Sequence, residues 1–180
     1  KLFNMKFQNN KQSYGLLAKI FHWLTFFILI VQLPLGIYLN NLEFSDFKLT
    51  VENIHILIGM TIFYITIFRL IWKSINVYPE HSSSISAIQI IAARISHWLF
   101  YVTLLTITLT GMLKLLMAGE EVNFIFINYE SNYIDYDLAE IFHTLHSISA
   151  YFLILLFVVH ILAVIYHHYF LKDAILKKML

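Results

Sequence analysis

Residues 141–180 read IFHTLHSISAYFLILLFVVHILAVIYHHYFLKDAILKKML, and they contain a largely apolar run of 22 residues from Leu145 to Tyr166. An α-helix rises about 1.5 Å per residue, so this run is long enough to cross a hydrocarbon core of about 30 Å. The sequence therefore predicts a transmembrane helix that carries histidines inside it.

Two of these histidines, His146 and His160, are 14 positions apart. At about 100° per residue their side chains differ in direction by only about 40°, so both lie on one face of the helix. Along the axis they are about 21 Å apart, too far to hold one metal ion. The spacing instead indicates two sites, each able to hold a planar cofactor near one membrane surface.

The composition is that of an integral membrane protein: 59% of the residues are hydrophobic and only 13% are charged. Soluble domains carry about 25% charged residues. The chain has no cysteine, which excludes disulfides, thiolate-held iron–sulfur clusters and covalently attached haem. A metal or haem must then be held by histidine, and nothing supports nucleic-acid binding.

Four apolar runs predict four membrane helices at about 16–39, 50–73, 92–117 and 140–169. The first run is too long for the core of a signal peptide, so we expect a retained helix. Short connections between the runs favour an all-α, up-down-up-down four-helix bundle that forms one domain over residues 1–180. We also expect Ser84 to cap a lead-in to the third helix.

Lysine and arginine gather at both ends of the chain and between the second and third runs, whereas the other two connections are acidic. The positive-inside rule therefore places both termini in the cytoplasm. This topology gives each histidine a depth. His22 and His160 lie on the inner side of the membrane, and His55 and His146 lie on the outer side.

Ligation of a non-covalent haem by two histidines needs one imidazole on each side of the macrocycle, which facing helices of a bundle supply. The depths predict an inner haem iron held by His22 and His160 and an outer haem iron held by His55 and His146. His97 also lies near the inner surface and competes with His22. His143 competes with His146 but is turned about 100° away from the face of His160.

Three further residues fit these two haems. Gly36 and Gly59 lie at the depth of the outer haem, where a missing side chain gives the macrocycle clearance. Arg69 is 14 residues after His55, at the depth of the inner haem, and suits a propionate. His167 follows His160 by seven residues on nearly the same face, and suits a quinone, a propionate or simply the interface.

The chain resembles the bacterial cytochrome b561 family, small four-helix di-haem membrane cytochromes that include superoxide oxidase. The resemblance is carried by FHW around His22, by NIHILIG with FRLIW around and after His55, and by LHSISAYFLILLFVVH followed by HHYFLKD. It implies two haem b groups ligated at His22, His55, His146 and His160, and it favours His22 over His97. It also implies electron exchange with ubiquinone in the bacterial inner membrane.

We therefore expect a di-haem b protein that moves single electrons between an outer-face donor and the quinone pool. Superoxide oxidation coupled to ubiquinone reduction is the specific form of this hypothesis. The outer connections are acidic, with Lys48 and Lys114 as their only basic residues, which suits a cationic redox partner protein better than an anion. The alternatives are a haem-b anchor subunit that wires a partner dehydrogenase or hydrogenase, and a histidine-lined transporter without haem.

Overall fold

The computed structural model describes residues 7–80, 85–124 and 127–180. Its long helices are α1 (Leu16–Asn40), α2 (Asp46–Ile75), α3 (Ala87–Met117) and α4 (Tyr136–Tyr166). The shorter elements are the strands β1 (Val122–Asn123) and β2 (Asn128–Tyr129), the π-helical turn η2 (His167–Leu171) and the helix α5 (Ile175–Met179).

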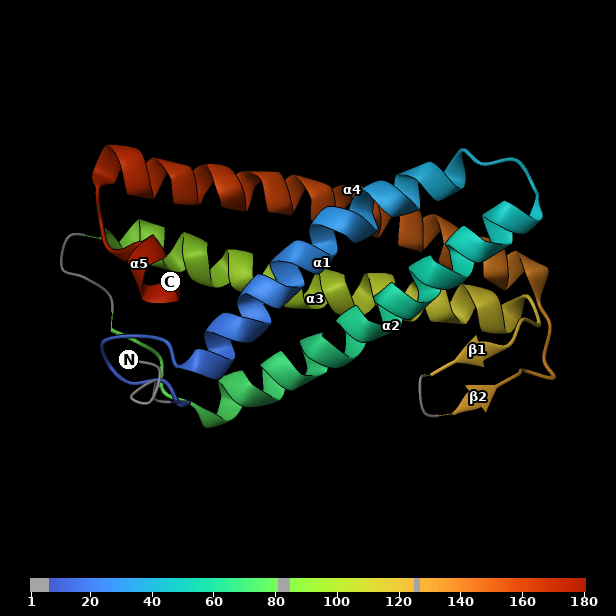
Figure 1. Ribbon diagram of the computed structural model, residues 1–180, viewed down its shortest axis with the longest axis horizontal. Coiled ribbons are helices and arrows are strands. Elements are labelled where there is room, and N and C mark those ends of the chain that lie inside the picture. Colours follow the sequence, from blue (N-terminus) through green and yellow to red (C-terminus); the bar gives the residue numbers. More distant parts are fainter. Residues whose placement is uncertain (1–6, 81–84, 125–126) are drawn as a thin grey trace.

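The four long helices form one bundle in which α3 and α4 lie side by side along their length, while α1 and α2 cross them obliquely (Figure 1). Both termini, α5 and the α2–α3 connection lie at one end of this bundle. The α1–α2 connection and the β1–β2 hairpin lie at the other. We call these the termini end and the hairpin end. This arrangement is the predicted up-down-up-down topology.

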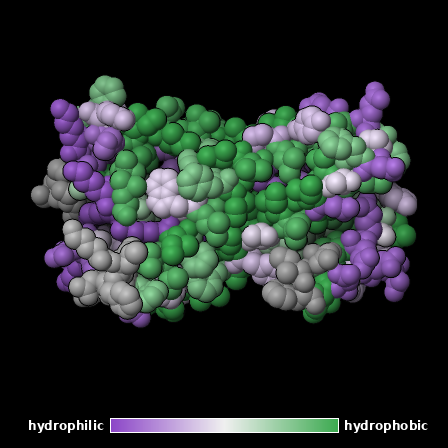
Figure 2. Space-filling view, viewed as in Figure 1, coloured by the Kyte–Doolittle hydropathy of each residue, from purple (hydrophilic) through white to green (hydrophobic). Residues whose placement is uncertain are grey.

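All four long helices are long and apolar enough to cross a membrane, with spans of 25, 30, 31 and 36 residues when η2 is counted with α4. Apolar side chains cover the middle of the molecule, and hydrophilic side chains gather at its two ends (Figure 2). The prediction of an all-α, four-helix membrane bundle is confirmed. The small antiparallel β1–β2 hairpin was not predicted.

Three of the long helices begin before the predicted positions, because polar side chains cap them. Ser45 accepts a hydrogen bond from the backbone N–H of Lys48 at the start of α2. Asp135 accepts one from Leu138 at the start of α4. At the start of α3, Ser86 and Gln89 form a reciprocal capping box. Ser84, the cap we expected for that helix, lies outside the described residues.

The core between the two ends draws one residue from each long helix: Leu29, Ile62, Leu104 and Leu153. Beyond η2 the chain turns at Lys172, which has φ +52°, so that α5 returns to the bundle. There the indole N–H of Trp23 donates to the backbone carbonyl of Met179 at 2.9 Å. The last residues are thereby fixed against α1 at the termini end.

Candidate functional site

At the hairpin end the bundle brings together the imidazoles of His55 on α2 and His146 on α4. Their ring centroids are 6.2 Å apart and their planes meet at 72°. The Nδ1 atom of His146 lies 2.7 Å from the backbone carbonyl oxygen of Ile107 on α3. A carbonyl can only accept, so Nδ1 carries the hydrogen and Nε2 keeps its lone pair for a metal.

The spacing of the two rings fits a haem iron between them. A metal–imidazole bond is about 2.0–2.1 Å long and the nitrogen lies about 1.1 Å from its ring centre, so two imidazoles on opposite sides of one iron have centres about 6.3 Å apart. The observed 6.2 Å agrees with this value. The residues present are therefore able to hold the iron axially.

Three imidazoles meet at the termini end. His160 on α4 lies 6.3 Å from His22 on α1, centroid to centroid. It lies 6.2 Å from His97 on α3. Both distances fit axial ligation, so spacing alone does not separate the two candidates. His97 has a 3.4 Å contact between its Nδ1 and the hydroxyl of Tyr78, which gives it a polar neighbour toward the surface.

Glycines allow the close approach of both rings at the hairpin end. A Cβ atom added at Gly36 on α1 would lie 3.0 Å from Cε1 of His55. A Cβ at Gly111 on α3 would lie 3.0 Å from Nδ1 of His146. At Gly59 the nearest atom would be Nε2 of Gln32, at an ordinary 3.6 Å. Gly36 and Gly111 thus face the ligand rings themselves.

Sequence reasoning missed Gly111, although a signal was present. It follows His97 by 14 residues, the same separation that places Gly36 after His22. It also missed Gln32, whose amide nitrogen donates to the backbone carbonyl of His55 at 2.9 Å. Hydrogen bonding of this kind depends on which helix faces which, and the periodicity of one helix does not reveal it.

A group of basic and aromatic side chains lies beside the termini-end rings. The guanidinium carbon of Arg69 is 5.8 Å from the centroid of the Tyr101 ring. One turn later on α2, the Nζ of Lys73 is 4.9 Å from the same centroid and 4.5 Å from that of Trp98. Within the described parts of the chain neither cation forms an ion pair with a carboxylate. Such a pair of cations suits a propionate or another anion.

A surface cleft of about 730 Å³ opens next to this group and is lined by Lys73, Tyr78, Pro79, Glu80, Arg94 and Trp98. Its one carboxylate, Glu80, is paired with Lys11 at 3.3 Å. Tyr14, which precedes α1, lies against Tyr78 with ring centroids 6.1 Å apart. Burial, reinforced by Tyr78, raises the pKa of the Tyr14 phenol, so Tyr14 stays neutral at ordinary pH.

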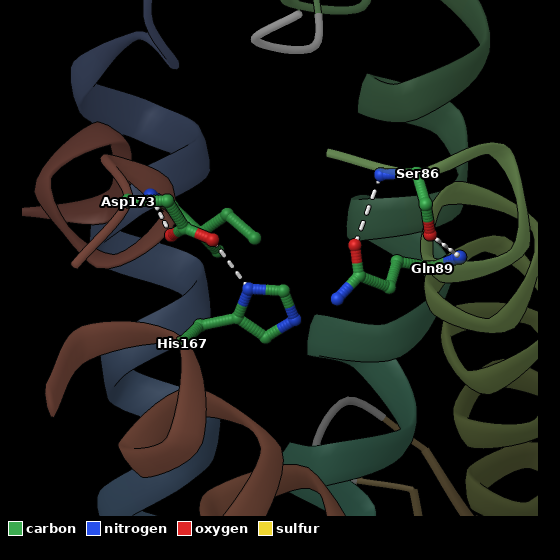
Figure 3. A network of polar contacts seen from close by, with 5 residues as sticks. Ser86, Gln89, His167 and Asp173 are labelled. Atoms are coloured by element: carbon green, nitrogen blue, oxygen red, sulfur yellow. Dashed lines mark hydrogen bonds and ion pairs between the residues drawn. The ribbon is translucent and has the colours of Figure 1, made fainter. Parts of the chain in front are cut away.

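His167 begins η2 at the same end, and its Nδ1 lies 2.5 Å from Oδ2 of Asp173 (Figure 3). The other carboxylate oxygen of Asp173 accepts from the backbone N–H of Ile175 at 3.1 Å, so the acid also caps α5. Both side chains are largely buried, at 15% and 5% exposure. Asp173 was not among the predicted residues.

His143, the predicted competitor of His146, lines a smaller cleft of about 300 Å³ at the hairpin end together with Lys114, Tyr136, Ala139 and Glu140. The structure thus brings His55 together with His146, and it places His143 at the surface nearby. Lys114 on α3 is 3.7 Å from Glu52 on α2, so the basic residue of this cleft is partly neutralised.

Four membrane helices with imidazoles paired across the bundle at the spacing of axial ligands define a membrane cytochrome of the b type. The family model described as prokaryotic cytochrome b561 matches residues 13–180. The chain therefore belongs to the prokaryotic cytochrome b561 family, as the resemblance indicated. Membership implies haem b as the cofactor and electron transfer in a membrane as the activity.

Two curated proteins are similar over nearly the whole chain. Cytochrome b561 homolog 2 of Escherichia coli strain K12 is 28% identical over 179 residues, covering 98% of this chain and 95% of that protein. Probable superoxide oxidase CybB of Yersinia pestis is 25% identical over 177 residues, covering 94% of this chain and 96% of that protein. The likeness thus extends through all four helices.

Proposed function

We propose that this chain holds two haem b groups, one on each pair of imidazoles, and passes single electrons from a donor at the hairpin end to a quinone at the termini end. The observation that carries the proposal is that α4 supplies one ring to each pair, His146 and His160, at partner distances of 6.2 and 6.3 Å. Haem iron supplies the one-electron redox chemistry when bound.

In this proposal His55 and His146 hold the hairpin-end haem, and His22 and His160 hold the termini-end haem. The family resemblance and the contact of His97 with Tyr78 support His22 as the partner of His160. Arg69 pairs with a propionate of the termini-end haem, because it is a cation in the bundle without a carboxylate partner among the described residues. Gly36 and Gly59 give clearance at the hairpin-end haem.

The His167–Asp173 pair gives the termini end a group that handles protons. Reduction of a quinone to a quinol takes up protons as well as electrons. An imidazole whose Nδ1 is held 2.5 Å from a buried carboxylate keeps its Nε2 free to donate to a quinone oxygen and to be recharged from the cytoplasm. His167 is therefore the proposed hydrogen-bond partner of ubiquinone.

The charge distribution orients the protein. Basic residues cluster at the termini end, where Lys11, Lys19, Lys73, Arg94, Lys172, Lys177 and Lys178 lie. By the positive-inside rule this end faces the cytoplasm, and the protein is a multi-pass component of the bacterial inner membrane. The donor then reaches the hairpin end from outside.

Superoxide is the proposed donor in the specific form of the function, and the relative named probable superoxide oxidase supports it. The alternative is a haem-b anchor subunit that receives electrons from a docked partner enzyme. It is favoured by the acidic connections at the hairpin end and by exposed aromatic side chains there, including Phe44 at 84% and Tyr136 at 71% exposure. A docked partner would cover both.

The deciding experiment is a dithionite-reduced minus oxidised spectrum of the detergent-purified full chain, with haem counted as the pyridine haemochrome. We expect about two haem b per chain. Fewer than two would contradict the paired-site proposal, and none would favour a histidine-lined transporter. Gel filtration of the same sample separates the two donor models, because only the anchor model requires a stoichiometric partner subunit.

A further inference from the structure

Gln32 is a buried polar side chain in the apolar helix α1, with 7% of its surface exposed. Its Nε2 donates to the backbone carbonyl of His55 at 2.9 Å. Its Oε1 has no hydrogen-bond partner among the described residues. A buried amide oxygen without a partner is costly inside a membrane bundle, so this atom needs an explanation.

The second unexplained atom is Nδ1 of His55, which is also buried and has no partner in the described chain. Its counterpart on the facing helix is satisfied, since Nδ1 of His146 donates to the carbonyl of Ile107 at 2.7 Å. A histidine that binds a metal through Nε2 carries its hydrogen on Nδ1 and almost always donates it to an acceptor. One ring of the hairpin-end pair therefore lacks the acceptor that the other ring has.

The packing of α1 against α2 brings the two unsatisfied atoms to one place. Gly36, one turn beyond Gln32 on α1, faces the His55 ring, because a Cβ there would be 3.0 Å from Cε1 and 3.6 Å from Nδ1. Gly59, one turn beyond His55 on α2, leaves the room in which the Gln32 amide lies, 3.6 Å from a Cβ at that position. Gln32 is thus held against the backbone of the same histidine whose ring turns toward α1.

We propose that Gln32 is the positioning residue of His55: its Oε1 accepts the Nδ1–H of His55, directly or through one water, when Nε2 binds iron. The inference rests on the proposed ligation of a haem by His55 and His146. It assigns the two axial ligands different acceptors, a side-chain amide for His55 and a backbone carbonyl for His146. Of these two acceptors, only Gln32 can be changed by substitution.

The acceptor on Nδ1–H controls how strongly the imidazole donates electrons to iron. Replacing the amide oxygen by an apolar group weakens this donation and raises the reduction potential of the hairpin-end haem. Replacing it by a carboxylate strengthens the donation and lowers the potential. The termini-end haem, on the other side of the leucine and isoleucine core, keeps its potential in both cases.

The test is a redox titration of Gln32→Met and Gln32→Glu in the full chain, with both haems resolved by their absorbance bands and by electron paramagnetic resonance of the ferric state. We expect opposite shifts of the hairpin-end haem, each a several-fold change in its one-electron equilibrium constant, where tenfold corresponds to about 59 mV. Thr66→Val is the control, since this hydroxyl is 1% exposed and donates to Ile62 in its own helix.

The inference is wrong if Gln32→Met shifts the hairpin-end haem no more than Thr66→Val does, or if both haems shift together. Should Gln32→Met lose that haem, Gln32→Glu decides, because it keeps an oxygen acceptor without the amide donor. Retention of the haem at a lowered potential then supports the Nδ1 bond, and loss in both variants contradicts it. A count below two in the unmutated protein would contradict the proposed function instead.

Discussion

The imidazoles of the hairpin end are held within narrow limits by single missing atoms. Alanine at Gly111 or Gly36 would place a Cβ 3.0 Å from the ring of His146 or His55, closer than carbon and ring atoms normally approach, so the ring must move. We predict that Gly111→Ala and Gly36→Ala each lose most of the hairpin-end haem, leaving about one haem per chain in the pyridine haemochrome count.

Gly59→Ala is the matched variant, because its Cβ would meet only Gln32 at an ordinary contact distance of 3.6 Å. If clearance for the ring is what matters, this variant keeps the wild-type haem content. If Gly59 clears the macrocycle, it loses haem as Gly36→Ala does. Wild-type haem content in all three variants would contradict both explanations.

Individual histidines separate the two sites. We predict that His160→Ala loses the termini-end haem and retains the other, and that His146→Ala does the reverse, because each ring belongs to one pair. His22→Ala reproduces the spectrum of His160→Ala, whereas His97→Ala keeps both haems. The measurement is the reduced-minus-oxidised spectrum. Loss of the termini-end haem in His97→Ala instead of His22→Ala would transfer the ligand role to α3.

At the scale of elements, the end of α4 depends on one buried carboxylate. Asp173 bonds His167 at 2.5 Å and caps α5 at Ile175. We predict that Asp173→Ala lowers the free energy of unfolding by about 1–3 kcal/mol, measured as the thermal midpoint of the oxidised protein in detergent. It also slows reduction of ubiquinone, because His167 loses the group that orients it.

Lys172→Gly is the control for this turn. It changes a residue at φ +52°, where glycine is preferred, so it leaves stability unchanged or raises it by about 1 kcal/mol or less. Asp173→Asn keeps the size of the side chain and one acceptor, so it falls between the wild type and Asp173→Ala. Unchanged quinone kinetics in Asp173→Ala would remove the pair from the proposed proton path.

The elements also show where sequence reasoning succeeds and where it stops. The apolar runs predicted the fold, and residue counting along each helix put His22, His55, His146 and His160 in pairs that the structure brings to 6.2–6.3 Å. Both rest on periodicity within one helix. Gln32, Gly111 and Asp173 act through contacts between helices or around a π-helical turn, and these depend on rotations of the helices that no single segment encodes.

At the scale of the whole molecule, the acidic hairpin end makes the sign of a salt effect informative. The two connections at this end carry many more carboxylates than basic residues, so they repel an anion and attract a cation. We predict that the rate of reduction by superoxide rises with ionic strength, because salt screens the repulsion over a Debye length of about 8 Å at 0.15 M. Stopped-flow reduction of the haem measures this.

A neutral donor serves as the control and should show no salt dependence, and a cationic donor should show the opposite sign. Glu140→Gln, in the cleft beside His143, should speed the reaction with superoxide at low salt and flatten its salt dependence. A rate with superoxide that falls as salt is added would mean that a local positive field, such as that of Lys114, governs access.

One helix, α4, contributes a ring to each pair, so the separation of the two redox centres is a residue count. Inserting one residue between His146 and His160 would turn one ring by about 100° relative to the other, whereas inserting seven would restore its direction and lengthen the gap by about 10 Å. Apolar substitutions on the lipid side of this segment change neither quantity. Insertions and deletions are therefore the class of natural variation that this stretch should exclude, even where its membrane-spanning character would permit them.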